Sequence, residues 1–172
     1  MSLILSGNSG SMTVDSTAGV TFPNGTNPQA APSKVLQVVQ ATTTSAITTT
    51  STSAVNTNIT ASITPLFSTS KVLIMITTPY SISRSTSNVY GDIYYQITRG
   101  ASIVCGPQRL ALNFNNNTWT DFDQQIAVNY LDSPATTSST TYTLQVYQSN
   151  PNTLAIPFGS SLGIIQLMEI AA

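Results

Sequence analysis

Six acidic side chains are the residues of this sequence best equipped for chemistry: Asp15, Asp92, Asp121, Asp123, Asp132 and Glu169. Asp121 and Asp123 lie two positions apart in a predicted strand, so their carboxylates share one face and are neighbours. Two carboxylates about 5–10 Å apart suit the hydrolysis of a glycosidic bond. With carbonyl and Asn oxygens added, they suit Ca²⁺. A solvated polar face explains the same spacing, and the sequence favours this interpretation.

Most other groups that catalysis and metal binding require are missing from the sequence. It contains no histidine and one cysteine, Cys105. We expect Cys105 to be a small buried side chain, because no imidazole is available to activate its thiol. No GxSxG, HExxH, CxxC or Walker motif and no DxDxDG-type calcium loop occurs. We therefore predict a protein that is not an enzyme and has no cofactor or metal ion; a depolymerase using Asp121 and Asp123 is the enzymatic alternative.

Glu169 stands out because it lies inside an apolar strand near the end of the chain, LGIIQLMEI (Leu162–Ile170). An unpaired buried carboxylate is costly. One interpretation therefore places Glu169 at an interface between subunits, hydrogen-bonded or paired with an arginine. The other places it at a sheet edge that faces water, and the sequence does not decide between the two.

Several aromatic side chains alternate with polar neighbours: Tyr80, Tyr90, Tyr94, Trp119, Tyr130 and Tyr147. Exposed Tyr and Trp rings near Asn and Asp side chains are suited to a sugar-binding face. The candidate contacts to a glycan or a protein partner are Trp119, Asp121, Asp123 and Tyr94. Subunit contacts or the rim of a core are the more ordinary places for such residues.

The composition excludes several classes of partner. Only 6% of the 172 residues are charged and the net charge is −1, so we expect the chain to bind neither nucleic acid nor an anionic membrane. The longest apolar runs, such as VLIMI (Val72–Ile76), are too short to cross a bilayer. The first ten residues lack the basic and apolar regions of a signal peptide. Because there are 27 Thr and 23 Ser residues, neutral hydrogen-bonding groups must form most of the polar surface.

Period-two alternation places these residues on strands. It is clearest in NVYGDIYYQITRGASIVC (Asn88–Cys105), where the odd positions are mostly apolar and the even positions are polar or phenolic. Residues 99–102 are typical of a tight turn, with Gly100 where a type II′ hairpin needs a positive φ. This turn predicts that Ile97 faces Val104 on the core side.

The remaining elements indicate one all-β domain. Further strands are predicted at residues 35–40, 58–64, 110–114, 118–131 and 141–148, with one or two exposed strands within 41–57. Lys71–Thr78 and Leu162–Ile170 are apolar on both faces, which is typical of a central strand or of one that faces a neighbouring subunit. Short strands separated by Gly, Pro and Asn turns predict an antiparallel β-sandwich or jelly roll of about eight strands.

Residues 1–33 differ from the rest and are predicted to form an extended N-terminal anchoring arm, with residues 34–172 as the knob domain. The arm is rich in Gly, Ser, Asn and Pro. Its apolar residues are too few for a core and too many for a solvated linker, so we take them as the anchoring residues; a flexible tail is the alternative. They are Leu3, Ile4, Leu5, Val14, Val20 and Phe22.

Six segments, taken in order, carry a family resemblance: SGNSGSMTVDSTAGVTFPNGTNPQAA, SKVLQVVQATTTSAITTTS, NITASITPLFSTSKVLIMI, YYQITRGASIVCG, DSPATTSSTTYTLQVY and LMEIAA. The series resembles small fibre, head-spike and head-decoration (cement) proteins of tailed bacteriophages over nearly the whole chain. The motifs are loose, but their order is fairly specific. DSPATTSSTTYTLQV is also similar to the trimeric jelly-roll heads of the tumour-necrosis-factor and complement-C1q type.

The resemblance implies a component of the phage particle without catalysis, a homotrimer about a three-fold axis that contacts other virion proteins. It assigns no receptor-contact residue. Two roles stay open: a decoration or spike protein held on the head by residues 1–33, and a tail-fibre or neck-fibre tip that binds host surface polysaccharide.

Overall fold

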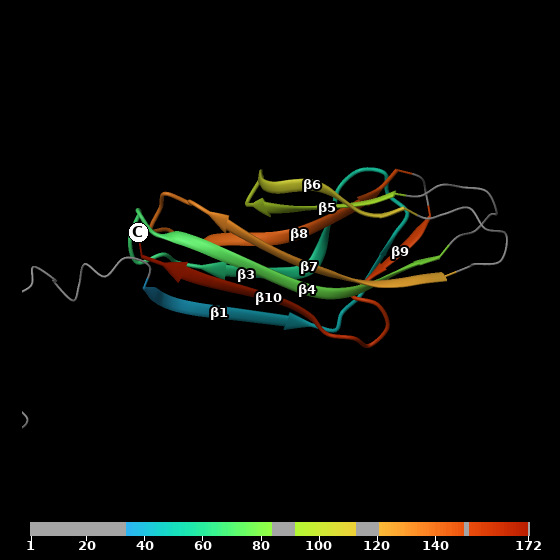
Figure 1. Cartoon of the computed structure of the whole chain (residues 1–172), viewed down its shortest axis with the longest axis horizontal. Coiled ribbons are helices and arrows are strands. Elements are labelled where there is room, and N and C mark those ends of the chain that lie inside the picture. Colours follow the sequence, from blue (N-terminus) through green and yellow to red (C-terminus); the bar gives the residue numbers. More distant parts are fainter. Residues whose placement is uncertain (1–33, 84–91, 113–120, 150–151, 172) are drawn as a thin grey trace, which may run out of the picture. The chain divides into compact units, whose positions relative to one another are not determined.

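The computed structural model of the 172-residue chain describes residues 34–83, 92–112, 121–149 and 152–171. The chain divides into two units, Met1–Pro32 and Ser33–Ala172, and the described residues belong to the second. Its strands (Figure 1) are β1 (Val35–Thr43), β2 (Ile47–Thr49), β3 (Val55–Ile63), β4 (Lys71–Ser83), β5 (Asp92–Arg99), β6 (Ser102–Leu112), β7 (Asp121–Asp132), β8 (Thr140–Gln148), β9 (Thr153–Ile156) and β10 (Gly163–Ile170). Within these ranges, no helix is long and apolar enough to span a membrane.

The strands pair as one long antiparallel ribbon that is folded back on itself. β5 pairs with β6, β4 with β7, β3 with β8, β2 with β9 and β1 with β10, so in the sequence each pair encloses the pair named before it. The predicted hairpin turn at residues 99–102 is the tip of this ribbon. The ribbon also curls, because strands of different pairs join edge to edge. The free edge of β10 pairs with β4, and the free edge of β8 pairs with β5.

Curling the ribbon produces two sheets. In sheet A, β10 lies between β1 and β4, β7 pairs with the other edge of β4, and β9 and β2 extend the sheet beside the second half of β4. Sheet B has the order β3-β8-β5-β6. The orders β1-β10-β4-β7 and β3-β8-β5-β6 are those of a jelly roll, the double sheet built from two Greek keys. The predicted fold class, an all-β antiparallel sandwich, is therefore confirmed; the short strand β9 was not predicted.

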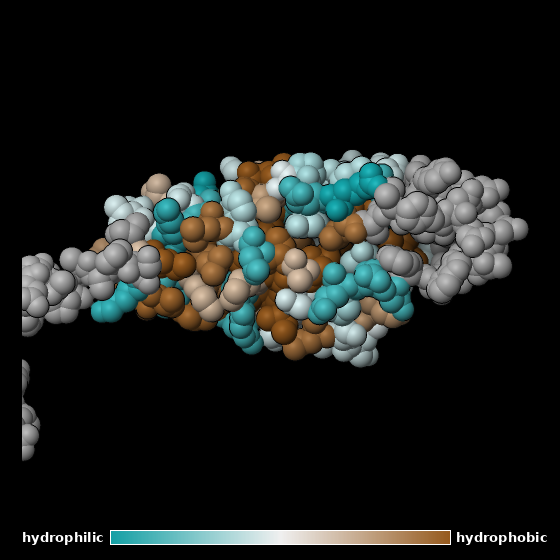
Figure 2. Space-filling view, in the orientation of Figure 1, coloured by the Kyte–Doolittle hydropathy of each residue, from teal (hydrophilic) through white to brown (hydrophobic). Residues whose placement is uncertain are grey.

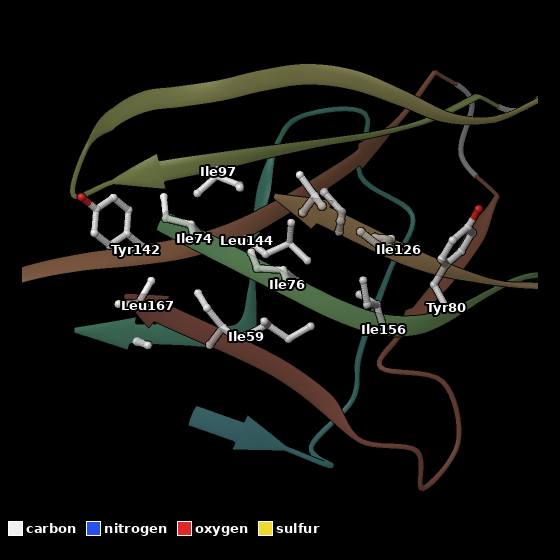
Figure 3. Close-up of a cluster of buried hydrophobic side chains, with 14 of the residues drawn as sticks. Ile59, Ile74, Ile76, Tyr80, Ile97, Ile126, Tyr142, Leu144, Ile156 and Leu167 are labelled. Atoms are coloured by element: carbon white, nitrogen blue, oxygen red, sulfur yellow. The ribbon is translucent and has the colours of Figure 1, made fainter. Parts of the chain in front are cut away.

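The core fills the space between the sheets with aliphatic side chains (Figure 3). At most 1% of each of these side chains is exposed: Ile74, Ile76 and Leu167 from sheet A, and Ile59, Ile97 and Leu144 from sheet B. Burying one such side chain contributes about 1.5–3 kcal/mol relative to leaving it in water. Repeated burial on alternate positions is therefore enough to fix which face of each strand points inward.

The two strands that are apolar on both faces are the central pair of sheet A, which agrees with the predicted central position; the alternative, contact with a neighbouring subunit, stays a prediction. β10 lies between β1 and β4, and β4 lies between β10 and β7. In β4, Val72, Ile74 and Ile76 point into the core, while Leu73 and Met75 point outward and are half-buried.

Pro79 lies within β4, where a missing N–H is normally costly. On one side of β4, β10 pairs only as far as Thr77 and β9 begins to pair at Ser81. Pro79 therefore lies between two partner strands and forfeits no ladder hydrogen bond on that side. Its carbonyl oxygen accepts a hydrogen bond of 3.1 Å from the N–H of Phe158.

The β5–β6 hairpin has the predicted turn but a different register. Gly100 has φ +55°, as the type II′ position requires. Ile97 pairs with Cys105, so the predicted pairing of Ile97 with Val104 is wrong. A β-bulge between the two strands shifts the register by one residue, and alternation alone does not reveal where a bulge lies.

Gly106 is the second place in this hairpin that requires glycine. Its φ is +99°, and a Cβ there would lie 2.8 Å from the carbonyl oxygen of Tyr95. The backbones of β5 and β6 therefore approach each other more closely here than any side chain permits.

Candidate functional site

The predicted contact residues that the structure describes lie at one end of the sandwich, and Tyr94 and Asp123 point to different faces. We call the end with the β5–β6 turn the Arg99 end, and the end where β5 and β7 begin the Asp92 end. Tyr94, Asp121 and Asp123 all belong to the Asp92 end. Tyr94 points outward from sheet B, whereas the exposed Asp123 points outward from sheet A, so they do not form one site. Trp119, the side chain of Asp121 and the six anchoring residues of the arm lie outside what the structure describes.

The described side chains give Asp123 of β7 no cluster of metal-ligating side chains of the His, Cys, Asp or Glu kind. Among those side chains, no group of three or more His, Cys, Asp or Glu residues could hold a metal ion. The outward position of Asp123 agrees with a solvated polar face.

Tyr94 forms an aromatic stack on the outer face of sheet B. It pairs directly with Tyr147 of β8, and the two ring centroids are 5.0 Å apart with an interplanar angle of 12°. Both rings are half-buried. Stacked rings of this geometry contribute about 0.5–1.5 kcal/mol beyond the area they bury.

A carboxylate and a guanidinium complete this group. One oxygen of Asp92 lies 3.3 Å from Nε of Arg109, and the other accepts a hydrogen bond of 3.4 Å from the Tyr94 hydroxyl. The backbone of Asp92 exchanges two hydrogen bonds of 2.9 Å with Ser149. We call Asp92, Tyr94, Arg109 and Tyr147 the Tyr94 cluster.

Sequence reasoning found Tyr94 but did not predict its neighbours in the cluster. Arg109 pairs with Tyr94 only because the register of β5 and β6 shifts twice between the turn and Tyr94, once between Thr98 and Ile97 and once between Ile97 and Tyr95. Tyr147 appeared among the aromatic residues, yet its pairing depends on the long-range β5–β8 contact. The spacing of Asp92 and Tyr94 was the one local signal, since residues two apart share a face.

Many of the other polar side chains on the outer face of sheet B are neutral and bond to one another. Gln96 donates to Gln145 at 2.6 Å, and Gln145 donates to Asn56 at 2.7 Å, which makes a row of amides across three strands. Thr60 and Thr143 share a hydrogen bond of 2.9 Å. Outside the Tyr94 cluster, these side chains make the face polar without adding charge, as the composition predicted.

The outer face of sheet A differs because an apolar row crosses it. The strand registers align four side chains on β1, β10, β4 and β7: Val38, Met168, Leu73 and Leu131. Val38 is 53% exposed and Leu131 is 45% exposed. Apolar side chains gather over the area of β1, β10 and β4 in Figure 2. We call these four residues the apolar row.

Glu169 points into the sandwich and is 0% exposed, so the interpretation that it faces water is wrong. Its carboxylate accepts hydrogen bonds from Nε2 of Gln37 at 2.6 Å and from the N–H groups of Leu66 at 2.8 Å and Phe67 at 3.4 Å. No arginine is among these partners, and all of them belong to its own chain; a single chain does not test the predicted subunit interface. Burial acts to raise the pKa of Glu169, but the hydrogen bonds outweigh it and hold the pKa below its ordinary value.

These contacts have a consequence for the surface. The β3–β4 connection, which Glu169 holds through two N–H groups, presents Leu66 at 60% exposure and Phe67 at 55% exposure. The buried carboxylate therefore fixes a loop whose apolar side chains face outward at the Arg99 end.

A second buried carboxylate links the two sheets at the Arg99 end. Asp132 of β7 accepts hydrogen bonds of 2.7 Å from both Arg99 of β5 and the hydroxyl of Tyr142 of β8. Burial and the bond to Asp132 raise the pKa of the Tyr142 hydroxyl. The phenol therefore stays protonated and acts as a donor.

Cys105 is half-buried and its side chain packs against the core. Burial raises the pKa of its thiol, which makes the reactive thiolate scarcer. This agrees with the predicted packing role.

Comparison with known proteins gives no family. No protein-family model matches the sequence, and no curated protein matches it. Among solved structures, the chain is similar to the VP2 subviral particle of infectious bursal disease virus, with a TM-score of 0.36 and 10% identity over 78% of this chain and 39% of that chain. The chain therefore spans about 39% of the length of that protein. The jelly-roll assignment rests on the strand order of this chain itself.

Proposed function

We propose that this chain is a non-enzymatic structural protein of a virus particle. In this proposal it is a homotrimeric head decoration or spike protein of cement type, located on the surface of a tailed-phage particle and anchored there by residues 1–33. The sequence resemblance to phage fibre, spike and decoration proteins supports the role. The jelly-roll strand order is consistent with it, because viral capsid domains and lectins are frequent users of this fold.

The apolar row is the observation that carries the proposal. Soluble monomeric proteins rarely expose contiguous apolar patches larger than roughly a few hundred Å². Patches above that size mark surfaces that bind another molecule. The two outer faces of the sandwich differ in how their apolar side chains are arranged: sheet A aligns four of them in one row, with Val38 and Leu131 largely exposed, whereas sheet B pairs polar side chains with one another and exposes Ile103 on its edge strand β6. Sheet A is therefore the side that we assign to neighbouring subunits.

The loop held by Glu169 supplies a second contact in this proposal. Leu66 and Phe67 are more exposed than any other large apolar side chain that the structure describes. Their backbone is fixed, so presenting them to a partner costs little ordering entropy. We assign them to contacts with another virion protein.

The experiment is a mass measurement on the full-length protein by light scattering after gel filtration. The wild type is expected at three times the chain mass of 18.2 kDa. Val38→Asp puts a charge into the apolar row and is expected to give a monomer. Ile103→Asp is the matched control, because Ile103 is also 53% exposed but lies on β6 of sheet B. A monomeric wild type, or a Val38→Asp protein that keeps the mass of the wild type, contradicts the proposed interface.

Location on the particle needs a second experiment. Immunogold labelling with antibody to residues 34–172 is expected over the head, and a protein lacking residues 1–33 is expected to stay trimeric but to lose binding to particles. Gold at the tail or neck favours the alternative role, a fibre tip that binds host glycan. A truncated protein that still decorates particles excludes the arm as the anchor.

A further inference from the structure

We infer that the Tyr94 cluster is a binding site for an acidic sugar, a pyranose ring that carries a carboxylate. The inference goes beyond the structural role and does not depend on it. Four side chains from three adjacent strands form the site, and the row Tyr147–Tyr94–Arg109 crosses β8, β5 and β6 in direct register.

Arg109 supplies the charge that selects an acid. The other basic residues that the structure describes lie at the Arg99 end, where Lys34 and Lys71 lie next to the strand starts and Arg99 bonds to Asp132. Among the residues that the structure describes, Arg109 is therefore the basic residue at the Asp92 end, and its side chain is 43% exposed.

The ion pair with Asp92 orients the guanidinium of Arg109 and leaves its two Nη groups available as hydrogen-bond donors. Asp92 contacts Nε of Arg109 at 3.3 Å, and no protein acceptor is described for the two Nη groups. The Nη groups of arginine form a planar fork whose spacing matches the two oxygens of a carboxylate. A ligand carboxylate can therefore bind beside Asp92 while the existing pair holds the fork in place.

The aromatic stack supplies the surface for the sugar ring. β3 begins at Val55, which pairs with Val146, so no β3 residue lies opposite Tyr147. The segment before β3 continues beside this end of β8, where the N–H of Gln148 donates a hydrogen bond of 3.1 Å to the carbonyl oxygen of Ser51, and Tyr147 itself is half-buried, so part of its ring stays accessible. An aromatic ring offers an apolar face to the C–H groups of a pyranose and a hydroxyl to its oxygens.

Groups that can form hydrogen bonds with sugar hydroxyls lie on both sides of the Tyr94–Tyr147 stack. Asp92 accepts only one long bond of 3.4 Å from a hydroxyl and keeps acceptor capacity for a sugar. Gln145 and Gln96 each lie two residues along their strand from the stack, which is about 7 Å. That distance is close to the length of one pyranose ring, so the half-buried Gln145 can contact the next residue of a polysaccharide, while Gln96, at 7% exposure, supports Gln145 from below.

The test is an amide chemical-shift titration of the full-length ¹⁵N-labelled protein. The probes are methyl glucuronide, the matched neutral methyl glucoside, and sodium acetate. Glucuronide is expected to shift the amides of residues 92–95, 108–110 and 147–149 at concentrations where the other two probes do not. Equal shifts with acetate reduce the site to a carboxylate site and overturn the sugar inference. Equal affinity for the glucoside overturns the acidic class, and no shifts with any probe overturn the site.

Variants separate this site from an ordinary surface ion pair. Arg109→Gln is expected to weaken glucuronide binding about tenfold or more, because a charge-assisted bidentate contact is lost. Tyr147→Ala is expected to weaken it several-fold. Lys71→Gln removes the same charge at the Arg99 end and is expected to leave binding unchanged, and the dispersion of each spectrum reports folding. An Arg109→Gln protein that is folded and binds as the wild type does overturns the inference.

Discussion

Replacing Glu169 by Gln tests whether a buried carboxylate fastens the Arg99 end. The carboxylate accepts three hydrogen bonds, two of them at 2.6 and 2.8 Å. An amide at this position turns one acceptor into a donor that faces either Gln37 or the N–H of Leu66. Gln37 cannot flip to compensate without losing its own bond of 2.7 Å to the carbonyl oxygen of Thr64.

The magnitude follows from these contacts. A hydrogen bond to a charged group is worth about 1.5–3 kcal/mol, and a neutral one about 1 kcal/mol. Glu169→Gln loses one hydrogen bond to a charged group and strains or loses a second, neutral one. We therefore expect the free energy of unfolding to fall by about 3 kcal/mol at pH 7. For a domain of this size, that loss lowers Tm by about 10 °C.

The pH dependence has a definite sign. The pKa of Glu169 in the folded protein is lowered from an ordinary value of 4.5. Its contribution to stability is therefore complete above the unfolded pKa and is lost as the pH falls through the folded pKa. We expect the difference in stability between wild type and Glu169→Gln to be constant from pH 7 to about pH 5.5 and to shrink below pH 4.5.

Urea unfolding of the full-length protein, monitored by circular dichroism at several pH values, measures this difference. Gln166→Ala is the control, since Gln166 lies on the same strand but faces outward, where its side chain bonds to the exposed Gln40. It is expected to cost no more than about 0.5 kcal/mol. A Glu169→Gln protein within 1 kcal/mol of the wild type at pH 7, or a difference that persists at pH 3.5, refutes the reasoning.

Two further predictions concern a close backbone approach and a bond between the sheets. Gly106→Ala combines a strained positive φ with a Cβ that would lie 2.8 Å from a backbone oxygen, so we expect urea unfolding to show a loss of about 3 kcal/mol or more. Gly100→Ala, with φ +55° and no atom within 4 Å, is expected to cost about 1 kcal/mol, and equal losses would contradict the steric argument. Tyr142→Phe removes a donor to the buried Asp132 and is expected to cost about 2 kcal/mol, whereas Tyr147→Phe, which no described hydrogen bond depends on, is expected to leave the unfolding midpoint unchanged.

The faces of the strands were predictable from the sequence, whereas most of their partners were not. Alternation assigned Ile59, Ala61 and Ile63 to the core because burial of apolar side chains repeats with the period of a strand. Pairing is a long-range property: β1 pairs with β10 although the rest of the domain lies between them. Nothing local in VLQVVQATT specifies that partner.

The candidate site was predictable only in part, for the same reason. The face of Tyr94 was predictable from its own strand, but Arg109 is opposite Tyr94 only because the register shifts twice between the turn and Tyr94. For Glu169, the sequence revealed that a charge interrupts an apolar strand. It did not reveal that the partners would be a glutamine from the first strand and two backbone N–H groups of a loop.

The central position of β4 and β10 in sheet A explains why one face of each strand is apolar, but it does not explain the other face. That position explains the inward residues of β4, such as Ile74 and Ile76, which the other sheet covers. It does not explain Leu73, which points away from sheet B and lies in register between Met168 and Leu131. A central strand of a two-layer sandwich has one covered face, so its second apolar face needs a third layer. That third layer is what the proposed subunit contact supplies, and Val38→Asp is the variant that tests it.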